Sequence, residues 1–138
     1  MKFGIAGFGF VGQAVYGSVK NTQNVAIFDK YKKIGSFQDL LQQPFIFCCL
    51  PTPQAEDGSQ DFSEYFSFFN DLVQNKYNGI LIVKSTVLYE NIEPYLEKLN
   101  IVFNPEFLNQ RRAVDDFKNQ RVIIYADDIA FKNNISLA

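Results

Sequence analysis

The amino-acid sequence predicts an α/β fold of the doubly wound class, with six mostly parallel strands and helices on both faces of the sheet. Two patterns support this prediction. Short runs that are apolar at every position alternate with longer amphipathic runs, and a glycine-rich turn joins the first apolar run to the first amphipathic one. Strands that are apolar on both faces are typical of a parallel sheet covered by helices on both sides.

The short apolar runs are the expected strands, and the amphipathic runs between them are the expected helices. The strands are expected over residues 3–6, 25–28, 45–50, 80–83, 101–103 and 122–125. The helices are expected over residues 10–20, 36–41, about 63–73, 91–99 and 109–116. Ser36 is suited to cap the second helix, and Pro44 closes that segment.

The third expected helix begins after Asp61 or Ser63 and carries phenylalanines at helical spacing. This apolar stripe consists of Phe62, Phe66, Phe69 and Val73. A stripe with this spacing is more typical of a helix that faces the core than of an exposed binding surface. We therefore expect the stripe to pack against the sheet.

Composition excludes several classes of function. The chain has 138 residues, enough for one domain, and its 13 Lys and Arg against 15 Asp and Glu leave no basic excess for nucleic acid. It contains no histidine, which excludes an imidazole base and a zinc site built on histidine. Cys48 and Cys49 are adjacent, so we expect reduced thiols, no metal site and a cytoplasmic protein. No apolar run approaches the ~20 residues that a membrane helix requires.

The segment Gly7-Phe8-Gly9-Phe10-Val11-Gly12 lies between the first strand and the first helix. In a nucleotide-binding turn the first glycine permits the tight bend, the second admits a pyrophosphate and the third lets the helix pack on the strand. Backbone N–H groups at the start of the helix then bind the phosphates. This context favours a Rossmann-like cofactor site over a plain glycine turn, and by analogy we expect the strand order 3-2-1-4-5-6.

Asp29 ends the second expected strand at nearly the ~20-residue spacing of a ribose-binding acid. A carboxylate at this place accepts hydrogen bonds from the hydroxyls of the adenosine ribose and repels a 2′-phosphate. The residue therefore favours NAD over NADP, although Lys30, Lys32 and Lys33 lie beside it.

Three further segments follow the carboxyl ends of expected strands, where ligands bind in open α/β sheets. They are Cys49-Leu50-Pro51-Thr52-Pro53, Lys84-Ser85-Thr86-Val87 and Asn104-Pro105-Glu106-Phe107-Leu108. Together and in this order they resemble the N-terminal domain of the UDP-glucose/GDP-mannose 6-dehydrogenase family. The resemblance extends from residue 2 to about residue 126. It includes Gly58, Asp61, Ala113, Asp116 and residues 121–124.

The resemblance implies the oxidation of a nucleotide sugar's C6 alcohol to a carboxylate, with two NAD reduced and a thioester formed on a cysteine. It places the backbone of Phe10 and Val11 at the pyrophosphate and Asp29 at the ribose. The loop residues Pro51, Thr52, Ser85 and Thr86 would lie on the nicotinamide side. Thr86 would also orient a water, through which Glu106 would transfer a proton. Phe107 and Leu108 would contribute backbone to the sugar site.

The chain also departs from the family. The family's catalytic cysteine, and the lysine and asparagine that stabilise the oxyanion, lie beyond residue 138, while Cys49 matches a structural position. Leu88 and Glu90 stand where the family has proline and glycine, and Gln110 replaces an acid. We therefore expect an NAD-binding domain over residues 1–126, the start of a truncated element over residues 127–138, and no net oxidation of UDP-glucose by this chain alone.

Alternative interpretations remain open. The first is the cofactor-binding part of a nucleotide-sugar dehydrogenase that needs a missing C-terminal domain to hold its substrate. The alternative is a stand-alone NAD-binding module without catalysis, or a partner subunit that complements a full-length enzyme. We also expect self-association into a homo-oligomer through the sixth strand and residues 127–138. An unrelated Rossmann domain, such as a methyltransferase, fits the glycines but not the loops after the third and fifth strands.

Overall fold

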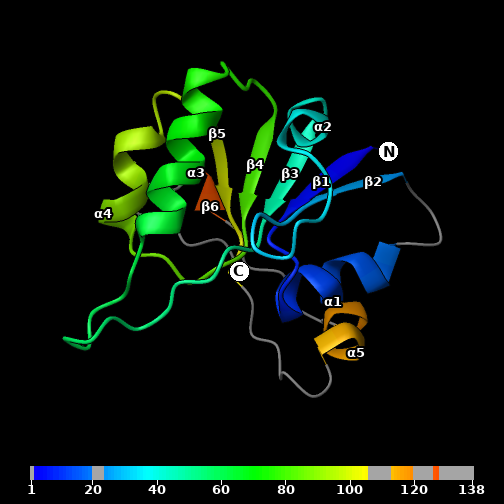
Figure 1. Ribbon diagram of the computed structural model, residues 1–138, viewed down its shortest axis with the longest axis horizontal. Coiled ribbons are helices and arrows are strands. Elements are labelled where there is room, and N and C mark those ends of the chain that lie inside the picture. Colours follow the sequence, from blue (N-terminus) through cyan, green and yellow to red (C-terminus); the bar gives the residue numbers. More distant parts are fainter. Residues whose placement is uncertain (1, 20–23, 106–112, 120–125, 128–138) are drawn as a thin grey trace.

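The computed structural model describes residues 2–19, 24–105, 113–119 and 126–127. Five parallel strands form the body of one sheet, and a short sixth strand pairs antiparallel with the fifth (Figure 1). The strands are β1 (Phe3–Ala6), β2 (Val25–Phe28), β3 (Phe45–Cys48), β4 (Ile80–Val83), β5 (Asn100–Phe103) and β6 (Ala126–Asp127). The predicted α/β class with a mostly parallel sheet is confirmed. The strand expected over residues 122–125 lies outside the described residues.

The predicted strand order was wrong. The observed order is β2-β1-β3-β4-β5-β6, so β3 lies beside β1 and not beyond β2. Only a short segment with one five-residue helix separates β2 from β3, and this connection carries the chain across β1 to its other side. The arrangement matches the second common order of doubly wound sheets, 2-1-3-4-5. In that order the ligand crevice opens between β1 and β3, where successive connections diverge.

Helices cover both faces of the sheet, as Figure 1 shows. Helix α1 (Phe10–Val19) covers one face, and α5 (Ala113–Lys118) packs against α1. The other face carries α2 (Phe37–Leu41), α3 (Ser63–Gln74), α4 (Tyr89–Ile92) and the 3₁₀ turn η1 (Glu93–Tyr95). In place of the helix expected over residues 91–99, the structure has the short helix α4 followed by η1. Pro94 lacks the N–H that would continue an α-helix through this segment. No described helix is long and apolar enough to cross a membrane.

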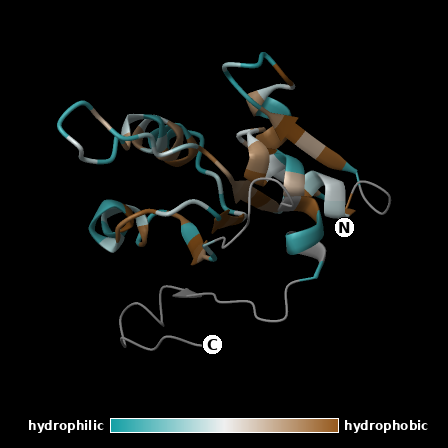
Figure 2. Ribbon diagram, turned by 90° about the horizontal axis from the view of Figure 1, so that it is seen from below, coloured by the Kyte–Doolittle hydropathy of each residue, from teal (hydrophilic) through white to brown (hydrophobic). Residues whose placement is uncertain are grey.

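The core divides into two layers because successive residues of each strand point to opposite faces. On the α1 face Phe3, Ile5 and Val15 are buried together, and on the other face Ile46 and Leu81 pack among the residues of α2, α3 and α4. Figure 2 shows the apolar residues gathered along the central strands, with hydrophilic residues on the outer surfaces of the helices.

The stripe expected on α3 is confirmed in part. Phe69 is buried in the core, and Phe62 and Val73 are partly buried against it. Phe66 is 38 % exposed, so this member of the stripe was wrong. The other buried residues of α3 are Tyr65, Phe68 and Leu72. The cap expected at Ser36 is confirmed, because its side chain accepts a hydrogen bond from the Asp39 N–H at 3.0 Å.

Candidate functional site

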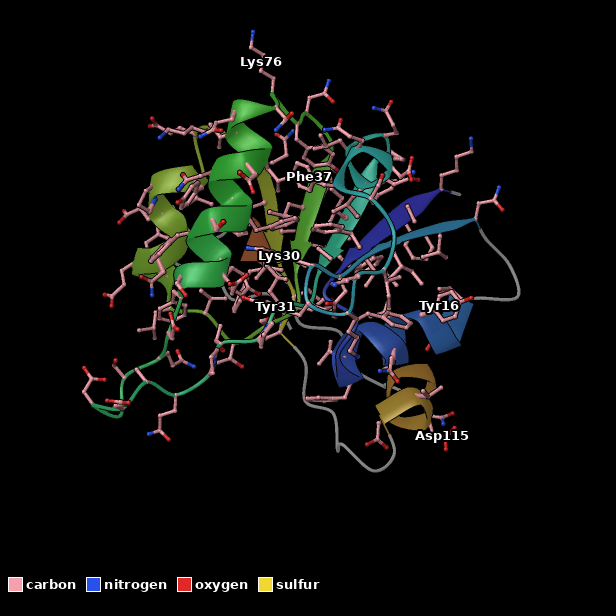
Figure 3. The ribbon with its side chains drawn as sticks, viewed as in Figure 1. Tyr16, Lys30, Tyr31, Phe37, Lys76 and Asp115 are labelled. Atoms are coloured by element: carbon pink, nitrogen blue, oxygen red, sulfur yellow. The ribbon has the colours of Figure 1, made fainter. Side chains whose placement is uncertain are left out.

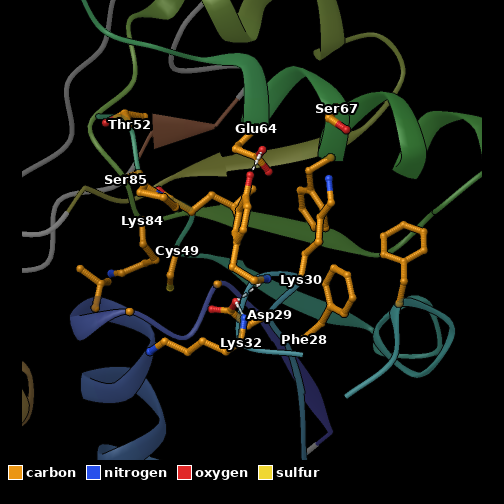
Figure 4. Close-up of a pocket in the computed structure, with 18 of the residues that line it drawn as sticks. Phe28, Asp29, Lys30, Lys32, Cys49, Thr52, Glu64, Ser67, Lys84 and Ser85 are labelled. Atoms are coloured by element: carbon orange, nitrogen blue, oxygen red, sulfur yellow. Dashed lines mark hydrogen bonds between the residues drawn. The ribbon is translucent and has the colours of Figure 1, made fainter. Parts of the chain in front are cut away.

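A cavity of about 730 Å³ opens at the carboxyl ends of β1, β2, β3 and β4 (Figure 4). Its floor is formed by the turn that follows β1 and by the segments that leave β3 and β4. One wall is the turn after β2, and the opposite wall is one side of α3, from Glu64 to the C-cap residue Asn75. The cavity therefore lies at the β1/β3 switch of the sheet, where doubly wound proteins bind their ligands.

The first and third glycines of the loop after β1 are required by close packing. Gly7 has φ 86°, a conformation that side-chain-bearing residues rarely adopt, and its N–H donates to the Phe28 carbonyl at 2.9 Å. A Cβ on Gly12 would lie 2.1 Å from the carbonyl oxygen of Gly7. Gly12 thus allows α1 to start directly against the turn that leaves β1.

The second glycine of the loop lies beside open space. A Cβ on Gly9 would meet no atom within 4 Å, and Gly9, Phe10 and Val11 all line the cavity. The N–H groups in the first turn of a helix have no intrahelical partner and attract anions. The space at Gly9 and the start of α1 therefore fit the pyrophosphate of a dinucleotide.

Asp29 joins the turn after β2 to the glycine loop. One carboxylate oxygen accepts the Phe8 N–H at 2.8 Å, and the other accepts the N–H groups of Tyr31 at 3.0 Å and Lys32 at 2.8 Å. Partial burial raises the pKa of Asp29, but the hydrogen bonds from Lys32, Phe8 and Tyr31 and the charge of Lys32 outweigh it, so the pKa is lowered overall. The carboxylate is charged at neutral pH, and much of its hydrogen-bonding capacity is used within the protein.

Two side chains from the same turn border the cavity. The Tyr31 hydroxyl donates to the Glu64 carboxylate on α3, and both residues line the cavity. The Lys32 ammonium lies at the glycine loop, where it donates to the Phe8 carbonyl at 2.5 Å. Figure 3 shows Lys30 and Tyr31 side by side between this turn and α3. Tyr31 and Glu64 were not predicted as site residues, because nothing in their sequence spacing indicates that the two side chains meet.

The opposite end of the cavity is built from the loops after β3 and β4. The Ser85 hydroxyl donates to the Leu50 carbonyl at 2.6 Å, and the Thr52 hydroxyl donates to the Thr86 carbonyl at 3.4 Å. These bonds hold the two loops together, and Pro51 lines the cavity between them. The two segments that the sequence analysis singled out therefore form one wall.

Lys84 is a buried cation at the base of this wall, with only 3 % of its surface exposed. Its ammonium donates to the Asn104 side-chain oxygen at 2.5 Å and thereby links the ends of β4 and β5. Burial lowers the pKa of Lys84 to about 8. No role was predicted for Lys84 from the sequence. A charged residue directly after the four apolar residues of β4 could have indicated a buried cation.

Both cysteines are buried. Burial raises the pKa of Cys48 to about 12, and burial and the neighbouring Cys48 raise the pKa of Cys49. Cys49 reaches the cavity wall, but its thiol stays protonated near neutral pH. A thiolate is the reactive form of cysteine. Neither residue is therefore suited to act as a nucleophile.

The structure brings the predicted cofactor residues together. Gly7, Gly9, Phe10, Val11, Asp29, Pro51, Thr52, Ser85 and Thr86 all line the cavity. Gly12 lies beneath the loop and packs against Gly7. Glu106, Phe107 and Leu108 lie outside the described residues, so their predicted catalytic and substrate-binding roles stay predictions.

The model of the NAD-binding domain of the UDP-glucose/GDP-mannose dehydrogenase family matches residues 34–135. The chain belongs to this family. The matched region contains the loops after β3 and β4, whereas the glycine loop and Asp29 precede it. The glycine loop and Asp29 are assigned to the candidate site because they line the cavity. The cofactor of the domain is NAD.

Two curated members of the dehydrogenase family are similar over most of this chain. The UDP-glucose 6-dehydrogenase of Haloferax volcanii is 29 % identical over 113 residues, which are 70 % of this chain and 26 % of the relative. The UDP-glucose 6-dehydrogenase of Pseudomonas aeruginosa is 32 % identical over 102 residues, which are 63 % of this chain and 22 % of the relative. The chain thus spans about a quarter of the length of these relatives.

Solved structures of family members share the fold. A UDP-glucose dehydrogenase from Pyrobaculum islandicum has a TM-score of 0.76 at 18 % identity and covers 92 % of this chain and 40 % of its own. A GDP-mannose dehydrogenase from Pseudomonas aeruginosa has a TM-score of 0.73 at 17 % identity. The match covers 92 % of this chain and 41 % of the dehydrogenase chain. These two structures therefore share the fold of this chain, which matches about two fifths of their length.

Proposed function

We propose that this chain is the NAD-binding part of a nucleotide-sugar 6-dehydrogenase of the UDP-glucose type. The whole reaction oxidises the C6 alcohol of the sugar to a carboxylate while two NAD are reduced. The observation that carries the proposal is the convergence of the predicted loop residues on one cavity at the β1/β3 switch. Both curated relatives described above are UDP-glucose 6-dehydrogenases by name.

The cavity supplies a complementary partner for each part of the cofactor. The N-terminus of α1 offers backbone N–H groups at Phe10 and Val11 to the pyrophosphate. Asp29 offers its remaining acceptor capacity to the adenosine ribose. Thr52 and Thr86, held together by a hydrogen bond, border the nicotinamide half. When bound, NAD supplies the hydride acceptor of the reaction.

The proton transfer in this proposal uses an acid and a hydroxyl, since the chain has no histidine. Thr86 is exposed at the cavity, where its hydroxyl is available to orient a water. Glu106 is assigned as the group that accepts the proton through this water, and Phe107 and Leu108 as contacts of the sugar. These last three assignments are supported by the family resemblance of the segment that follows β5.

The cysteine of the thioester step must come from outside these 138 residues. The chain has 2 cysteines, and burial keeps both thiols protonated near neutral pH. The oxidation of the aldehyde through a thioester needs a thiolate held against the substrate. We therefore propose that this chain binds NAD but completes no oxidation of UDP-glucose by itself.

A calorimetric titration of the chain with NAD, paired with an absorbance assay for NADH, tests this function. We expect saturable binding of one NAD per chain and no sustained NADH formation when UDP-glucose is added. Absence of NAD binding would contradict the assignment of the cavity. Sustained NADH formation would contradict the requirement for an external cysteine.

A non-catalytic NAD-binding module or partner subunit is the second candidate, because both cysteines of the chain are buried and neither can serve as the nucleophile. Mixing the chain with a cysteine-bearing C-terminal fragment of the Haloferax volcanii relative discriminates the two. NADH formation from UDP-glucose in the mixture supports a split dehydrogenase. NAD binding without turnover in the mixture supports the stand-alone module.

A further inference from the structure

Tyr31 places an aromatic ring at the wall of the cavity, although 68 % of the residue's surface is exposed. Its hydroxyl donates to the carboxylate of Glu64 on α3. Figure 4 shows this bond as the dashed line at Glu64, on the side of the cavity opposite Asp29. An exposed side chain keeps its rotamer freedom unless a contact offsets the entropy that it loses. Since burial contributes little here, the fixed position of the ring has to be explained by the hydrogen bonds that Tyr31 makes.

The backbone of Tyr31 is bonded to the acid assigned to the adenosine ribose. Its N–H donates to one carboxylate oxygen of Asp29 at 3.0 Å, while the other oxygen accepts the Phe8 N–H at 2.8 Å. The Tyr31 side chain therefore begins beside the ribose position and ends at α3. In a dinucleotide the adenine base is attached directly to this ribose. A base that continues from Asp29 into the space between the turn and α3 meets the Tyr31 ring.

The Tyr31 ring has a face free for a flat ligand. The Lys30 ammonium lies 5.9 Å from the centre of the ring, and Figure 3 shows the two side chains next to each other. The aromatic pairs of the described residues are formed by other rings, and Tyr31 takes part in none of them. Every nucleobase has a π face that stacks on an aromatic side chain. An unstacked ring in a nucleotide cavity is therefore suited to hold a base.

Glu64 supplies a fixed acceptor for the Tyr31 hydroxyl. It lies half-buried in the first turn of α3, a helix that packs on the sheet through Tyr65 and Phe68. The hydrogen bond to Glu64 raises the pKa of Tyr31, so the hydroxyl remains a donor at neutral pH. Glu64 and Asp71 both belong to the α3 wall of the cavity. Two acids on this wall favour an uncharged base over a phosphate at this place.

We propose that Tyr31 is a cofactor contact that stacks on the adenine base, and that Glu64 is the positioning residue that holds its ring in place. The proposal rests on the proposed function, because it assumes that the adenosine ribose of NAD lies at Asp29. It adds that affinity for the cofactor depends on the flat base as well as on the pyrophosphate.

Titrations of the full chain with NAD and with ADP test the role of the ring. The variant Tyr31→Ala should raise both dissociation constants by about tenfold to a hundredfold, the effect of losing one base–aromatic stack. The variant Tyr31→Phe keeps the ring and should lose less than Tyr31→Ala. The control Phe66→Ala removes a ring of α3 that is 38 % exposed and does not line the cavity, so affinity should change by less than about twofold. A melting curve checks that each variant is folded.

Two substitutions of Glu64 test the positioning role. Glu64→Ala and Glu64→Gln both remove the negative charge, but only glutamine keeps an oxygen that can accept from Tyr31. The dissociation constant for NAD should therefore be about threefold to tenfold higher in Glu64→Ala than in Glu64→Gln, the range of one hydrogen bond. Adding Tyr31→Phe to Glu64→Ala should cause no further loss, because both changes remove the same bond. Equal affinities of the alanine and glutamine variants would overturn the positioning role.

Contact between the ring and the base is measured directly by the nuclear Overhauser effect. With NAD bound, we expect cross-peaks between the Tyr31 ring protons and the H2 or H8 protons of adenine. NAD binding without these cross-peaks, or unchanged NAD affinity in Tyr31→Ala, overturns the inference and leaves the proposed function in place. Absence of NAD binding by the wild-type chain overturns the inference together with the proposed function.

Discussion

Gly12 lies so close to Gly7 that a Cβ on Gly12 would be 2.1 Å from the Gly7 carbonyl oxygen. The glycine loop therefore combines a packing role and a cavity-lining role in one short segment. Its first and third glycines are required by packing between β1 and α1, and its second faces the cavity. This division predicts that substitutions within one motif will have different consequences.

The variant Gly12→Ala should lose stability. Alanine has the better helix propensity by about 1 kcal/mol, but its methyl group would overlap a backbone carbonyl that cannot move aside without shifting β1. Overpacking of this kind costs about 1–3 kcal/mol or more, so we expect a net loss. Urea unfolding measures it, and a variant as stable as wild type would contradict the close packing.

The variant Gly9→Ala should fold normally and bind NAD poorly. A Cβ at this position meets no atom within 4 Å, so the free energy of unfolding should stay within about 0.5 kcal/mol of wild type. The methyl group would occupy the space through which a pyrophosphate approaches α1. We expect at least a tenfold rise in the dissociation constant by calorimetry, and unchanged affinity would remove the pyrophosphate from this place.

The variant Asp29→Asn should be less stable at neutral pH, because it replaces an ionised acceptor of three backbone N–H groups by a neutral amide. Hydrogen bonds to a charged group contribute about 1.5–3 kcal/mol, and partial exposure reduces the expected loss to about 1–2 kcal/mol.

The contribution of Asp29 to stability should also depend on pH with a defined sign. The pKa of Asp29 is lowered below 3.8 in the folded chain, so the unfolded chain takes up the proton first as the pH falls. The stability difference between wild type and Asp29→Asn should be constant above about pH 5 and shrink as the pH falls through the lowered pKa. Urea unfolding of both proteins from pH 7 to pH 3 measures this difference.

Lys84 should give a pH dependence of the same sign in the alkaline range, because its pKa is also lowered in the folded chain. Burial lowers its pKa from 10.5 to about 8, so above pH 8 the unfolded chain binds more protons than the folded chain. Folding stability should therefore rise with pH from about 8 toward 10.5 because of this residue. The variant Lys84→Met should lack this rise, and the comparison removes the contributions of the tyrosines and cysteines. Parallel pH dependences of the two proteins would exclude a buried ammonium at this position.

Much of the fold follows from local patterns in the sequence. The runs around Ile5, Ile27 and Leu81 are apolar on both faces, and this pattern by itself requires a covered parallel sheet. The order of the strands is not contained in such runs. Placing β3 beside β1 or beyond β2 leaves the same residues at the carboxyl ends of the strands. Only the length of the connection between residues 29 and 44 distinguishes the two arrangements.

In the candidate site, too, some residues were predictable from the sequence and others depend on the tertiary arrangement. Gly7 and Asp29 were predictable because each follows a strand end in a recognisable spacing, and Thr86 was predictable from the family resemblance of its segment. The contact between Tyr31 and Glu64 joins residues far apart in the sequence and depends on how α3 crosses the sheet. No local pattern carries that information. The occupation of Asp29 by backbone N–H groups likewise depends on the turn after β2 folding back against the glycine loop.

The measurement that tests the central claim most directly is a map of NAD binding by ¹⁵N–¹H NMR, which suits a chain of 15.8 kDa. We predict that NAD shifts the amide signals of Gly9, Phe10 and Val11 at the start of α1, together with those of Asp29 and Thr86. Signals of residues such as Lys98, outside the cavity, should stay in place. A spectrum unchanged by saturating NAD, or changes confined to residues outside the cavity, would contradict the assignment of this cavity as the cofactor site.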